Sequence, residues 1–281
     1  MEYQNILYQK QGTIVHIVLN RPEKLNPLSD PLQIELVEAM RRAEDDREVR
    51  VIVLKANGRA FSAGYDITPT TPDRLEHHAP ALRQDIEGMR RRVERWGTIW
   101  NLSKPVIAQV HGYCLAGGTD LALHCDIIIA AESAKFGFPP VRTMGSPPTH
   151  MWTYYVGAQW AKYLLLTGNS VDGKTAERIG LIWKAVPDDK LEEEVNELAG
   201  TMAKVTWELL AANKSICNKA LELMGRSTLQ QMAAESDAIG HLAPIALEFG
   251  RIAREQGLKA ALDWRDGPFR DNRGAPKPPQ E

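Results

Sequence analysis

The sequence has little that would suit a disulfide-bonded, membrane-spanning or metal-binding protein. Its 281 residues include three cysteines, Cys114, Cys125 and Cys217, without any CxxC pair. They predict reduced thiols of a cytoplasmic protein and exclude a disulfide framework or a zinc site. No apolar run approaches the roughly 18 residues that a membrane-spanning helix needs. None of the seven histidines has the spacing of metal ligands, so no metal is expected.

An excess of charge of one sign is also missing. The formal net charge is −2, with 34 Lys and Arg against 36 Asp and Glu. Such a balance gives no electrostatic attraction to nucleic acid or to a membrane surface, so we expect neither partner. The start, Met1 to Asn5, lacks the basic and apolar stretches of a signal peptide, which agrees with the cytoplasmic localisation expected from the thiols.

Residues 1–190 alternate between strand-like and helix-like segments. A hairpin is predicted around Gln11 and Gly12, and helical spacing of apolar residues covers 31–47 and 82–100. Continuous apolar runs, typical of strands covered on both faces, occur at 51–54, 105–110 and 126–130. This alternation predicts βαβ units, a largely parallel sheet and an α/β fold class.

The remaining residues are predicted to be helical, followed by a tail. Amphipathic stretches indicate helices at 191–204, 206–224, 228–240 and 245–263. We therefore divide the chain into an α/β core at 1–190, a helical region at 191–265 and a proline-rich, disordered tail at 266–281. A further segment, 68–82, is rich in proline, threonine and histidine and predicts a mobile loop.

Two glycine-containing segments point to chemistry. They are Ala60–Ile67 and His111–Asp120, and each follows an apolar strand-like region. The Tyr65 N–H after Gly64 and the N–H groups of a helix starting at Gly117 could face one carbonyl oxygen as an oxyanion hole. Taken separately, each segment has an ordinary explanation: Asp66 as a helix cap, and the glycine pair as tight packing. Neither GxxxxGK(S/T) nor GxGxxG occurs, so the second segment is not a phosphate loop.

These segments and several others resemble the crotonase, or enoyl-CoA hydratase/isomerase, family over about residues 3–269. The matching motifs are Leu19–Asn26, Phe61–Asp66, Lys104–Ala108, Gly112–Gly118, Cys125–Ile127, Leu166–Gly168 and Ala176–Ile182. The resemblance implies a spiral of ββα turns and a C-terminal α-helical trimerisation region. It also implies an acyl-CoA thioester substrate and no separate cofactor. The expected assembly is a homotrimer or a dimer of trimers.

The resemblance also implies roles for individual residues. Tyr65 and Gly117 would be the oxyanion donors, and Asp120 falls at the position of the first catalytic glutamate. Coenzyme A would contact Lys24 and Leu25, together with Ala63, Asp66 and Ile67. Lys24 is alternatively a solvated turn lysine. Phe269 either reaches a neighbouring subunit's coenzyme A or packs within its own chain.

Two expected carboxylates are missing. In family hydratases a second glutamate shares the acid/base work, but its position here is Pro140, which has no proton to exchange. A third family position falls near Pro148, also without a carboxylate. Residues that could substitute are His150, Tyr154, Tyr155 and Arg142, each with an ordinary packing or surface explanation. His77 and His78 are more simply solvated loop residues. The arginines at 90–92 and 95 are expected to form a solvated helix face, with contact to a phosphate as the alternative.

The leading hypothesis is therefore an acyl-CoA-transforming enzyme that stabilises a thioester enolate, most simply an enoyl-CoA hydratase. Double-bond isomerisation and carbon–carbon cleavage of a cyclic β-keto acyl-CoA remain alternatives, because each can use one carboxylate. A third alternative is a crotonase scaffold that binds acyl-CoA or RNA without turnover.

Overall fold

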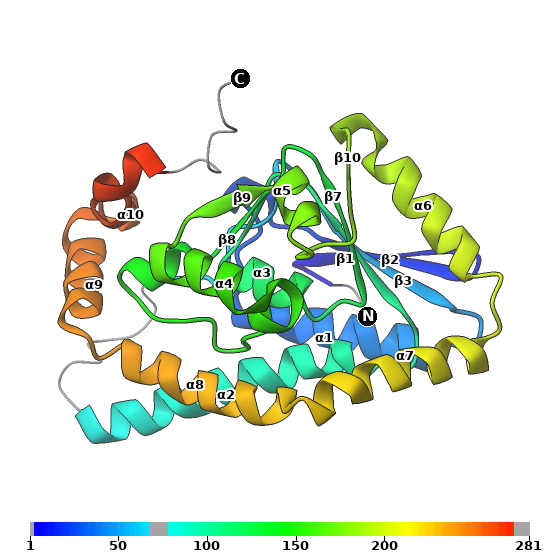
Figure 1. Ribbon diagram of the computed structural model, residues 1–281, viewed down its shortest axis with the longest axis horizontal. Coiled ribbons are helices and arrows are strands. Elements are labelled where there is room, and N and C mark those ends of the chain that lie inside the picture. The colour runs from blue at the N-terminus through cyan, green and yellow to red at the C-terminus, as the bar shows by residue number, and fades with distance from the viewer. Residues whose placement is uncertain (1–2, 68–77, 273–281) are drawn as a thin grey trace.

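The computed structural model describes residues 3–67 and 78–272, and its central feature is a six-stranded sheet (Figure 1). The strand order is β1-β2-β3-β5-β7-β10, and only β1 and β2 pair in antiparallel fashion. The predicted hairpin and largely parallel sheet are confirmed. The strands are β1 (Ile6–Gln11), β2 (Ile14–Leu19), β3 (Val51–Ala56), β5 (Val106–Val110), β7 (Ile127–Ala131) and β10 (Lys184–Val186).

A second, four-stranded sheet with the order β4-β6-β8-β9 carries the glycine segments. Its strands were not predicted; they are β4 (Ala60–Ser62), β6 (Tyr113–Leu115), β8 (Lys135–Gly137) and β9 (Ser170–Asp172). Each has three residues, too few for an alternating pattern to stand out. Each glycine segment therefore lies at the end of a short strand of this sheet, and β4 and β6 are parallel neighbours.

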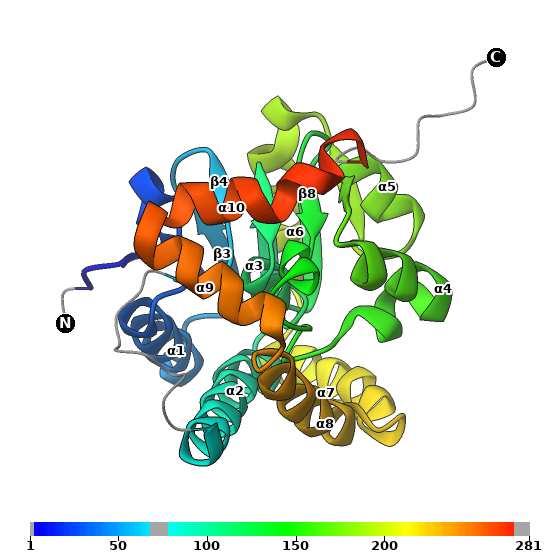
Figure 2. The same ribbon diagram turned by 90° about the vertical axis from the view of Figure 1, so that its left-hand side faces the viewer.

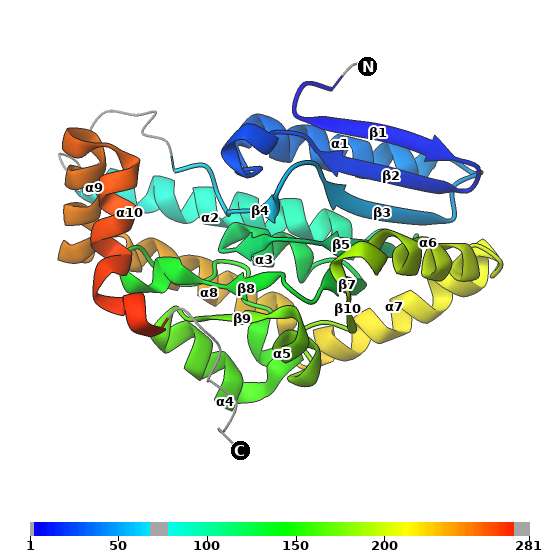
Figure 3. The ribbon, with the colours of Figure 1, turned by 90° about the horizontal axis from the view of Figure 1, so that it is seen from above.

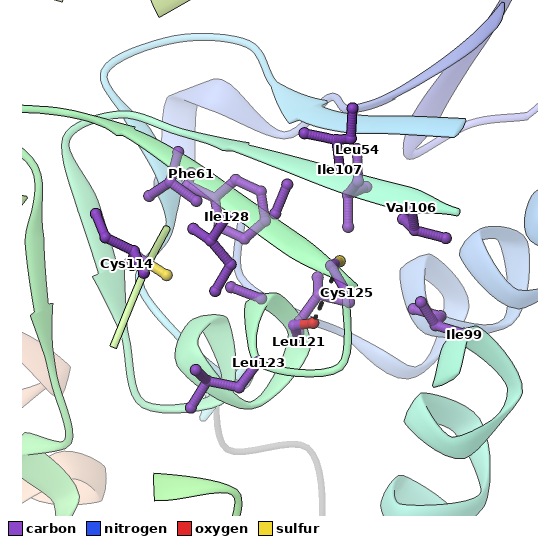
Figure 4. Packing of buried hydrophobic residues seen from close by; sticks show 14 of the residues in the cluster. Leu54, Phe61, Ile99, Val106, Ile107, Cys114, Leu121, Leu123, Cys125 and Ile128 are labelled. Atoms are coloured by element: carbon purple, nitrogen blue, oxygen red, sulfur yellow. Dashed lines mark hydrogen bonds between the residues drawn. The ribbon is translucent and has the colours of Figure 1, made fainter. Parts of the chain in front are cut away.

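The main core lies between the two sheets and the helix α3 (Gly117–Ala122). Phe61 of β4, Ile107 of β5 and Ile128 of β7 converge there with Leu121 of α3 (Figure 4). Cys125 is fully enclosed and donates its thiol to the Leu121 carbonyl at 3.7 Å. Burial of this apolar surface fixes β4, β6 and α3 relative to the main sheet, and with them the glycine segments.

Helices pack against the two sheets and form the remaining surface. The Ser29 hydroxyl caps the first helix by accepting from the Leu32 N–H. The predicted helices at 31–47 and 82–100 are confirmed with small shifts in their bounds. The helices of this part are α1 (Asp30–Asp45), α2 (His78–Trp100), α4 (Trp152–Thr167), α5 (Gly173–Arg178) and the short turns η1 (Pro22–Lys24), η3 (Pro139–Arg142) and η4 (Asp188–Lys190).

The C-terminal region is helical as predicted, with one break that was not predicted. Gly257, at φ 88°, divides the stretch expected as one helix at 245–263. The helices are α6 (Leu191–Met202), α7 (Trp207–Leu223), α8 (Arg226–Gly240), α9 (Pro244–Gln256) and α10 (Leu258–Asp266), followed by η5 (Gly267–Asn272). Helical structure thus extends six residues past 266, where the sequence analysis placed the start of a disordered tail.

Two helix pairs of this region bear on the site. Helix α8 runs beside α2 (Figures 1 and 2). The pair α9 and α10 crosses one end of the molecule, where Phe249 and Ile252 pack with Ile67 and Met144 (Figure 2). Figure 3 shows this pair at the end of the molecule opposite the β1–β2 hairpin turn and α6. The C-terminal helices therefore border the segments that follow β4 and η3.

Parts of two expectations lie outside the described residues. These are the predicted loop, apart from its last residues in α2, and the chain beyond Asn272. Within the described ranges, no helix is long and apolar enough to cross a membrane.

Candidate active site

The two glycine segments lie in direct contact. Gly64 has φ 112°, and a Cβ built on it would lie 2.7 Å from the Ala116 Cβ and 3.3 Å from the Gly117 nitrogen. Ala116 itself has φ 51° and ψ −123°, a backbone conformation that non-glycine residues rarely adopt. Strained backbone of this kind is concentrated at functional sites, and here it directs the chain into the first turn of α3.

Two backbone N–H groups at this contact have no acceptor among the described residues. Leu28 forms a parallel bridge in which its N–H donates to Gly64 and its carbonyl accepts from Asp66. The Tyr65 N–H, between these two bonded neighbours, is therefore directed away from Leu28. Gly117 is the first residue of α3, where the N–H has no intrahelical partner. This arrangement fits the predicted oxyanion donors.

The side chain of Tyr65 connects the same place to Asp120. Its hydroxyl donates to Asp120 Oδ2 at 3.0 Å and accepts from the Trp96 indole N–H, also at 3.0 Å. Its ring lies against Gly117, where an added Cβ would come within 2.8 Å of the ring carbons. Gly117 must therefore lack a side chain for Tyr65 to occupy this position.

The Asp120 carboxyl is enclosed and easily protonated. The residue is only 1% exposed. Its pKa is raised to about 7, mainly by burial and in smaller part by the negative charge of Asp237, whereas Thr149, Tyr65 and Arg92 oppose the increase. The Thr149 hydroxyl is buried beside this carboxyl without a well-formed hydrogen bond to any described residue. A carboxyl with this pKa can both accept and release a proton near neutral pH.

Asp120 is held from its backbone side by a histidine that stays neutral. The His124 ring bonds the Asp120 carbonyl through Nδ1 at 2.7 Å and contacts the Gln230 amide through Nε2 at 2.9 Å. Because the amide nitrogen can only donate, Nε2 accepts and Nδ1 carries the hydrogen. Burial lowers the His124 pKa to about 4, which agrees with this neutral form. Gln230 also donates to the Thr149 carbonyl, so α8 fixes both sides of the site.

The segment with the two missing carboxylates lies beside the Tyr65 and Gly117 N–H groups. Strand β8 pairs with β6, and the Gly137 carbonyl accepts from the Ala116 N–H at 2.9 Å. Pro140 follows in η3, and its carbonyl receives the N–H groups of Thr143, Met144 and Gly145. Residue 140 is therefore used to form a turn, and the neighbouring prolines at 147 and 148 are buried.

The residues predicted to contact coenzyme A come together in part. The Ala63 N–H donates to the Leu25 carbonyl at 2.9 Å, and Lys24 is exposed beside them. Asp66 is paired with Arg21 at 3.0 Å, a partner that the sequence analysis did not identify. Ile67 packs toward α9 and α10. Asn26 holds this corner together, since its amide donates to the carbonyls of residues 57 and 60.

The residues considered as substitutes for the missing carboxylates have other partners. His150 bonds Thr153 at 2.8 Å, and burial lowers its pKa. The hydroxyls of Tyr154 and Tyr155 donate to the carbonyls of residues 224 and 123. Arg142 pairs with Asp266 at 2.9 Å and lies over the Phe269 ring, so Phe269 packs within its own chain.

The arginines predicted to form a solvated helix face have separate roles. Arg90 pairs with Glu235 and Arg95 with Asp30. Arg92 instead stacks over the Tyr65 ring, with its Cζ 4.2 Å from the ring centroid, so for this residue the prediction is wrong.

Some members of the site were missed because their contacts are distant in sequence. Trp96, Thr149 and Asp237 come from α2, the segment before α4, and α8. An aromatic or polar residue in such a segment carries no local signal of what it will contact.

Within the described residues, no cluster of three or more His, Cys, Asp or Glu side chains could hold a metal ion.

Comparison with known proteins agrees with this geometry. The sequence profile of the enoyl-CoA hydratase/isomerase family matches residues 9–252. A probable enoyl-CoA hydratase from Rhizobium meliloti is 37% identical over 227 residues, which cover 79% of this chain and 84% of that protein. A crotonyl-CoA hydratase from Syntrophomonas wolfei is 30% identical over 273 residues, covering 96% and 99%.

Solved structures share the fold across its length. The crystal structure of an enoyl-CoA hydratase from Mycobacterium smegmatis superposes with a TM-score of 0.89 at 33% identity, covering 96% of this chain and 97% of that one. The resemblance inferred from the motifs is confirmed. This chain has the crotonase fold and belongs to the enoyl-CoA hydratase/isomerase family of enzymes.

Proposed function

We propose that this chain adds water across the α,β double bond of an enoyl-CoA thioester. The observation that carries the proposal is the pair of unpartnered N–H groups at Tyr65 and Gly117 beside the buried Asp120 carboxyl. A thioester oxygen held by these donors becomes more negative as the enolate forms, and one such donor is typically worth about 3–4 kcal/mol. The names of the relatives from Rhizobium meliloti and Syntrophomonas wolfei support the same reaction class.

Asp120 is the proposed acid/base group. In its ionised form the carboxylate takes a proton from water as the oxygen attacks the β-carbon. Its Oδ2 atom is occupied by Tyr65, whereas Thr149 lies on the same carboxyl with a hydroxyl available for a further bond. We propose that Oδ1 and the Thr149 hydroxyl position the attacking water.

Lys24, Leu25, Ala63, Asp66 and Ile67 remain the proposed coenzyme A contacts. The bond between residues 25 and 63 brings this set to the same side of the glycine segments. Exposed Lys24 suits a phosphate, and the backbone at Ala63 permits close approach of the adenine or pantetheine. The ion pair with Arg21 positions Asp66 at the edge of this surface.

The test is hydration of straight-chain 2-enoyl-CoA thioesters, beginning with crotonyl-CoA and extending to longer chains. Loss of the conjugated double bond lowers the ultraviolet absorbance, and mass spectrometry identifies the hydrated product. Asp120→Asn should reduce kcat by about 10²–10⁴-fold, the usual contribution of a general acid or base. Unchanged absorbance with every chain length would reject the hydratase proposal.

Double-bond isomerisation is the second candidate, because Pro140 leaves Asp120 as the single carboxylate among the family positions. A single base can move a proton between the α- and γ-carbons. If 3-enoyl-CoA is converted and 2-enoyl-CoA is not hydrated, the isomerase is favoured. A test with a cyclic β-keto acyl-CoA covers carbon–carbon cleavage. Binding by calorimetry without any product would favour a non-catalytic scaffold.

We also propose that the C-terminal helices assemble the chain as a homotrimer or a dimer of trimers. Large apolar side chains recur seven residues apart on one face of α7, at Leu209, Ile216 and Leu223, which are 56%, 63% and 90% exposed. The same spacing relates Met232 and Ile239 on α8. Apolar surface of this extent is typically covered by another protein surface.

A further inference from the structure

We propose that the phenol of Tyr65 is the second proton-transfer group of this site and performs the work that the missing carboxylate at position 140 would perform. The inference rests on the proposed function. It assigns a side-chain role to a residue whose backbone N–H is already one of the proposed oxyanion donors.

The hydrogen bonds of the phenol determine where its proton lies. The Trp96 indole N–H can only donate, so the Tyr65 oxygen accepts that bond at 3.0 Å. The phenol hydrogen is then free to point at Asp120 Oδ2, 3.0 Å away. A carboxylate, a hydroxyl and an orienting third group within hydrogen-bond distance form the arrangement by which enzymes activate a side chain.

Exposure distinguishes the members of this chain of contacts. Trp96 is fully buried and Asp120 almost so, at 0% and 1% exposure, whereas Tyr65 is partly exposed. The Tyr65 ring also lies against Gly117, the second oxyanion donor. Tyr65 is therefore the partly exposed member of the pair, and its ring borders the place where the enolate would form.

The surroundings keep the phenol protonated at neutral pH, and two neighbours offset part of the cost of forming its anion. Burial and the charge of Asp120 raise the Tyr65 pKa, while Arg92 and the Trp96 bond oppose this increase. The Arg92 guanidinium lies 4.2 Å from the ring centroid, close enough to favour negative charge on the ring. A phenolate formed during turnover would thus be held by a cation and an N–H donor.

The proton balance needs only one carboxylate. Asp120 takes a proton from water, and the water oxygen bonds to the β-carbon while the π electrons move to the α-carbon and the thioester oxygen. The enolate electron pair then forms a C–H bond with the phenol proton. The Asp120 carboxyl then gives its proton to the phenolate beside its Oδ2, which restores both groups. One H and one OH have been added to the double bond.

The decisive variant is Tyr65→Phe, which removes one oxygen and keeps both the ring and the backbone N–H. We expect kcat for crotonyl-CoA to fall by about 10²–10⁴-fold. Binding of saturated butyryl-CoA, measured by calorimetry, should change by less than about threefold. Tyr155→Phe is the matched control, because its hydroxyl bonds the Leu123 carbonyl and takes no part in the proposed chemistry. Wild-type kcat in Tyr65→Phe would overturn the inference.

A second assay separates this inference from the proposed function. Exchange of the α-protons of butyryl-CoA in deuterium oxide, followed by mass spectrometry, needs the hole and the proton-transfer group but no hydration. If wild type exchanges these protons without hydrating enoyl-CoA, the hydratase proposal fails and the phenol is still tested. Exchange in Tyr65→Phe at the wild-type rate would contradict the phenol's role.

A third measurement is needed if Tyr65→Phe does not fold because the Trp96 N–H has lost its acceptor. Fluorotyrosine introduced at position 65 alone keeps both hydrogen bonds and lowers the phenol pKa. The basic limb of the pH–rate profile should then move to lower pH. The surrounding charges, which are Asp120, Arg92 and the more distant Asp237, are the same in both proteins, so the shift reports on the phenol. An unmoved limb would show that the phenol only packs against the site.

Discussion

Asp120 is the residue at which stability and proposed activity oppose each other. Its carboxyl must be ionised to take a proton from water, yet its surroundings favour the protonated form and raise its pKa to about 7. A pKa raised above the unfolded value of 3.8 stabilises the folded state at pH below about 4. This stability is lost as the pH rises through about 7, and amounts to roughly 4 kcal/mol.

The first prediction concerns this linkage. Relative to wild type, Asp120→Asn should gain thermal stability between pH 4 and pH 8, because the amide carries no charge to bury. Melting temperatures at both pH values measure the effect. Glu193→Gln, which changes an exposed carboxylate, should show no such gain. An equal difference between Asp120→Asn and wild type at the two pH values would contradict the raised pKa.

The second prediction concerns the rate. The kcat/KM of wild type should fall below about pH 7 with the titration of one group, since only ionised Asp120 accepts the water proton. Asp237→Asn removes a negative charge that raises this pKa, so the limb should move to lower pH. If the kcat/KM of wild type instead falls near pH 4, the carboxyl that accepts the proton does not have a raised pKa.

The third prediction is steric. An alanine at position 117 would place its Cβ 2.8 Å from the Tyr65 ring. This contact would push the Tyr65 side chain away from Asp120. We expect Gly117→Ala to lower kcat by about 10²-fold or more, the scale of a lost oxyanion contact. Gly200→Ala is the control, since nothing lies within 4 Å of its added Cβ. Full activity in Gly117→Ala would contradict the packing of Tyr65 on this glycine.

At the scale of elements, the apolar segments identified five strands of the main sheet, but its short strand β10 and the strands that carry the site were not detected. Val51–Leu54 is a continuous apolar run that stands out, whereas β4 and β6 are three residues each. The two glycine segments could be singled out from the sequence because Gly64 and Gly117 belong to local motifs. The contact of Tyr65 with Asp120 and Trp96 spans 55 and 31 residues, so no local pattern could reveal it.

The end of the chain illustrates the same limit. Helical spacing predicted one helix at 245–263, but Gly257 adopts a positive φ and reverses the chain direction between α9 and α10 (Figure 2). The turn depends on tertiary packing of Phe249 and Ala261, which a periodic pattern does not encode.

The fourth prediction tests how α10 is held. Arg142, with a nearly buried side chain, bonds Asp266 and lies over Phe269. Arg142→Gln should increase hydrogen exchange in residues 258–272 while leaving β3 and β5 protected, because local opening costs less than global unfolding. Lys259→Gln, which removes an exposed ion pair with Asp263, should leave exchange unchanged. Unaltered exchange in Arg142→Gln would show that the apolar contacts alone hold the helix.

At the scale of the whole molecule, the site combines residues of the α/β core with residues of the C-terminal helical region. The core positions the Tyr65 and Gly117 N–H groups, and α8 supplies Gln230 and Asp237 to the segment at 144–150. The exposed apolar faces of α7 and α8 are the surfaces through which the proposed assembly would form.

The fifth prediction is the assembled mass. Light scattering should give three or six times the chain mass of 31.4 kDa. Leu223→Asp should shift the assembly toward monomer, because it charges the most exposed apolar position of α7, whereas Ile34→Asp on α1 should not. A monomeric wild type at micromolar concentration would reject the proposed assembly.

The central claim is that the Tyr65 and Gly117 N–H groups hold a thioester oxygen. A crystal structure with bound acetoacetyl-CoA tests it most directly. The account predicts that the thioester oxygen lies about 2.7–3.1 Å from both backbone nitrogens. It also predicts that the α-carbon faces the Tyr65 phenol and Asp120. A thioester oxygen bound elsewhere, with either N–H satisfied by another group, would contradict the claim.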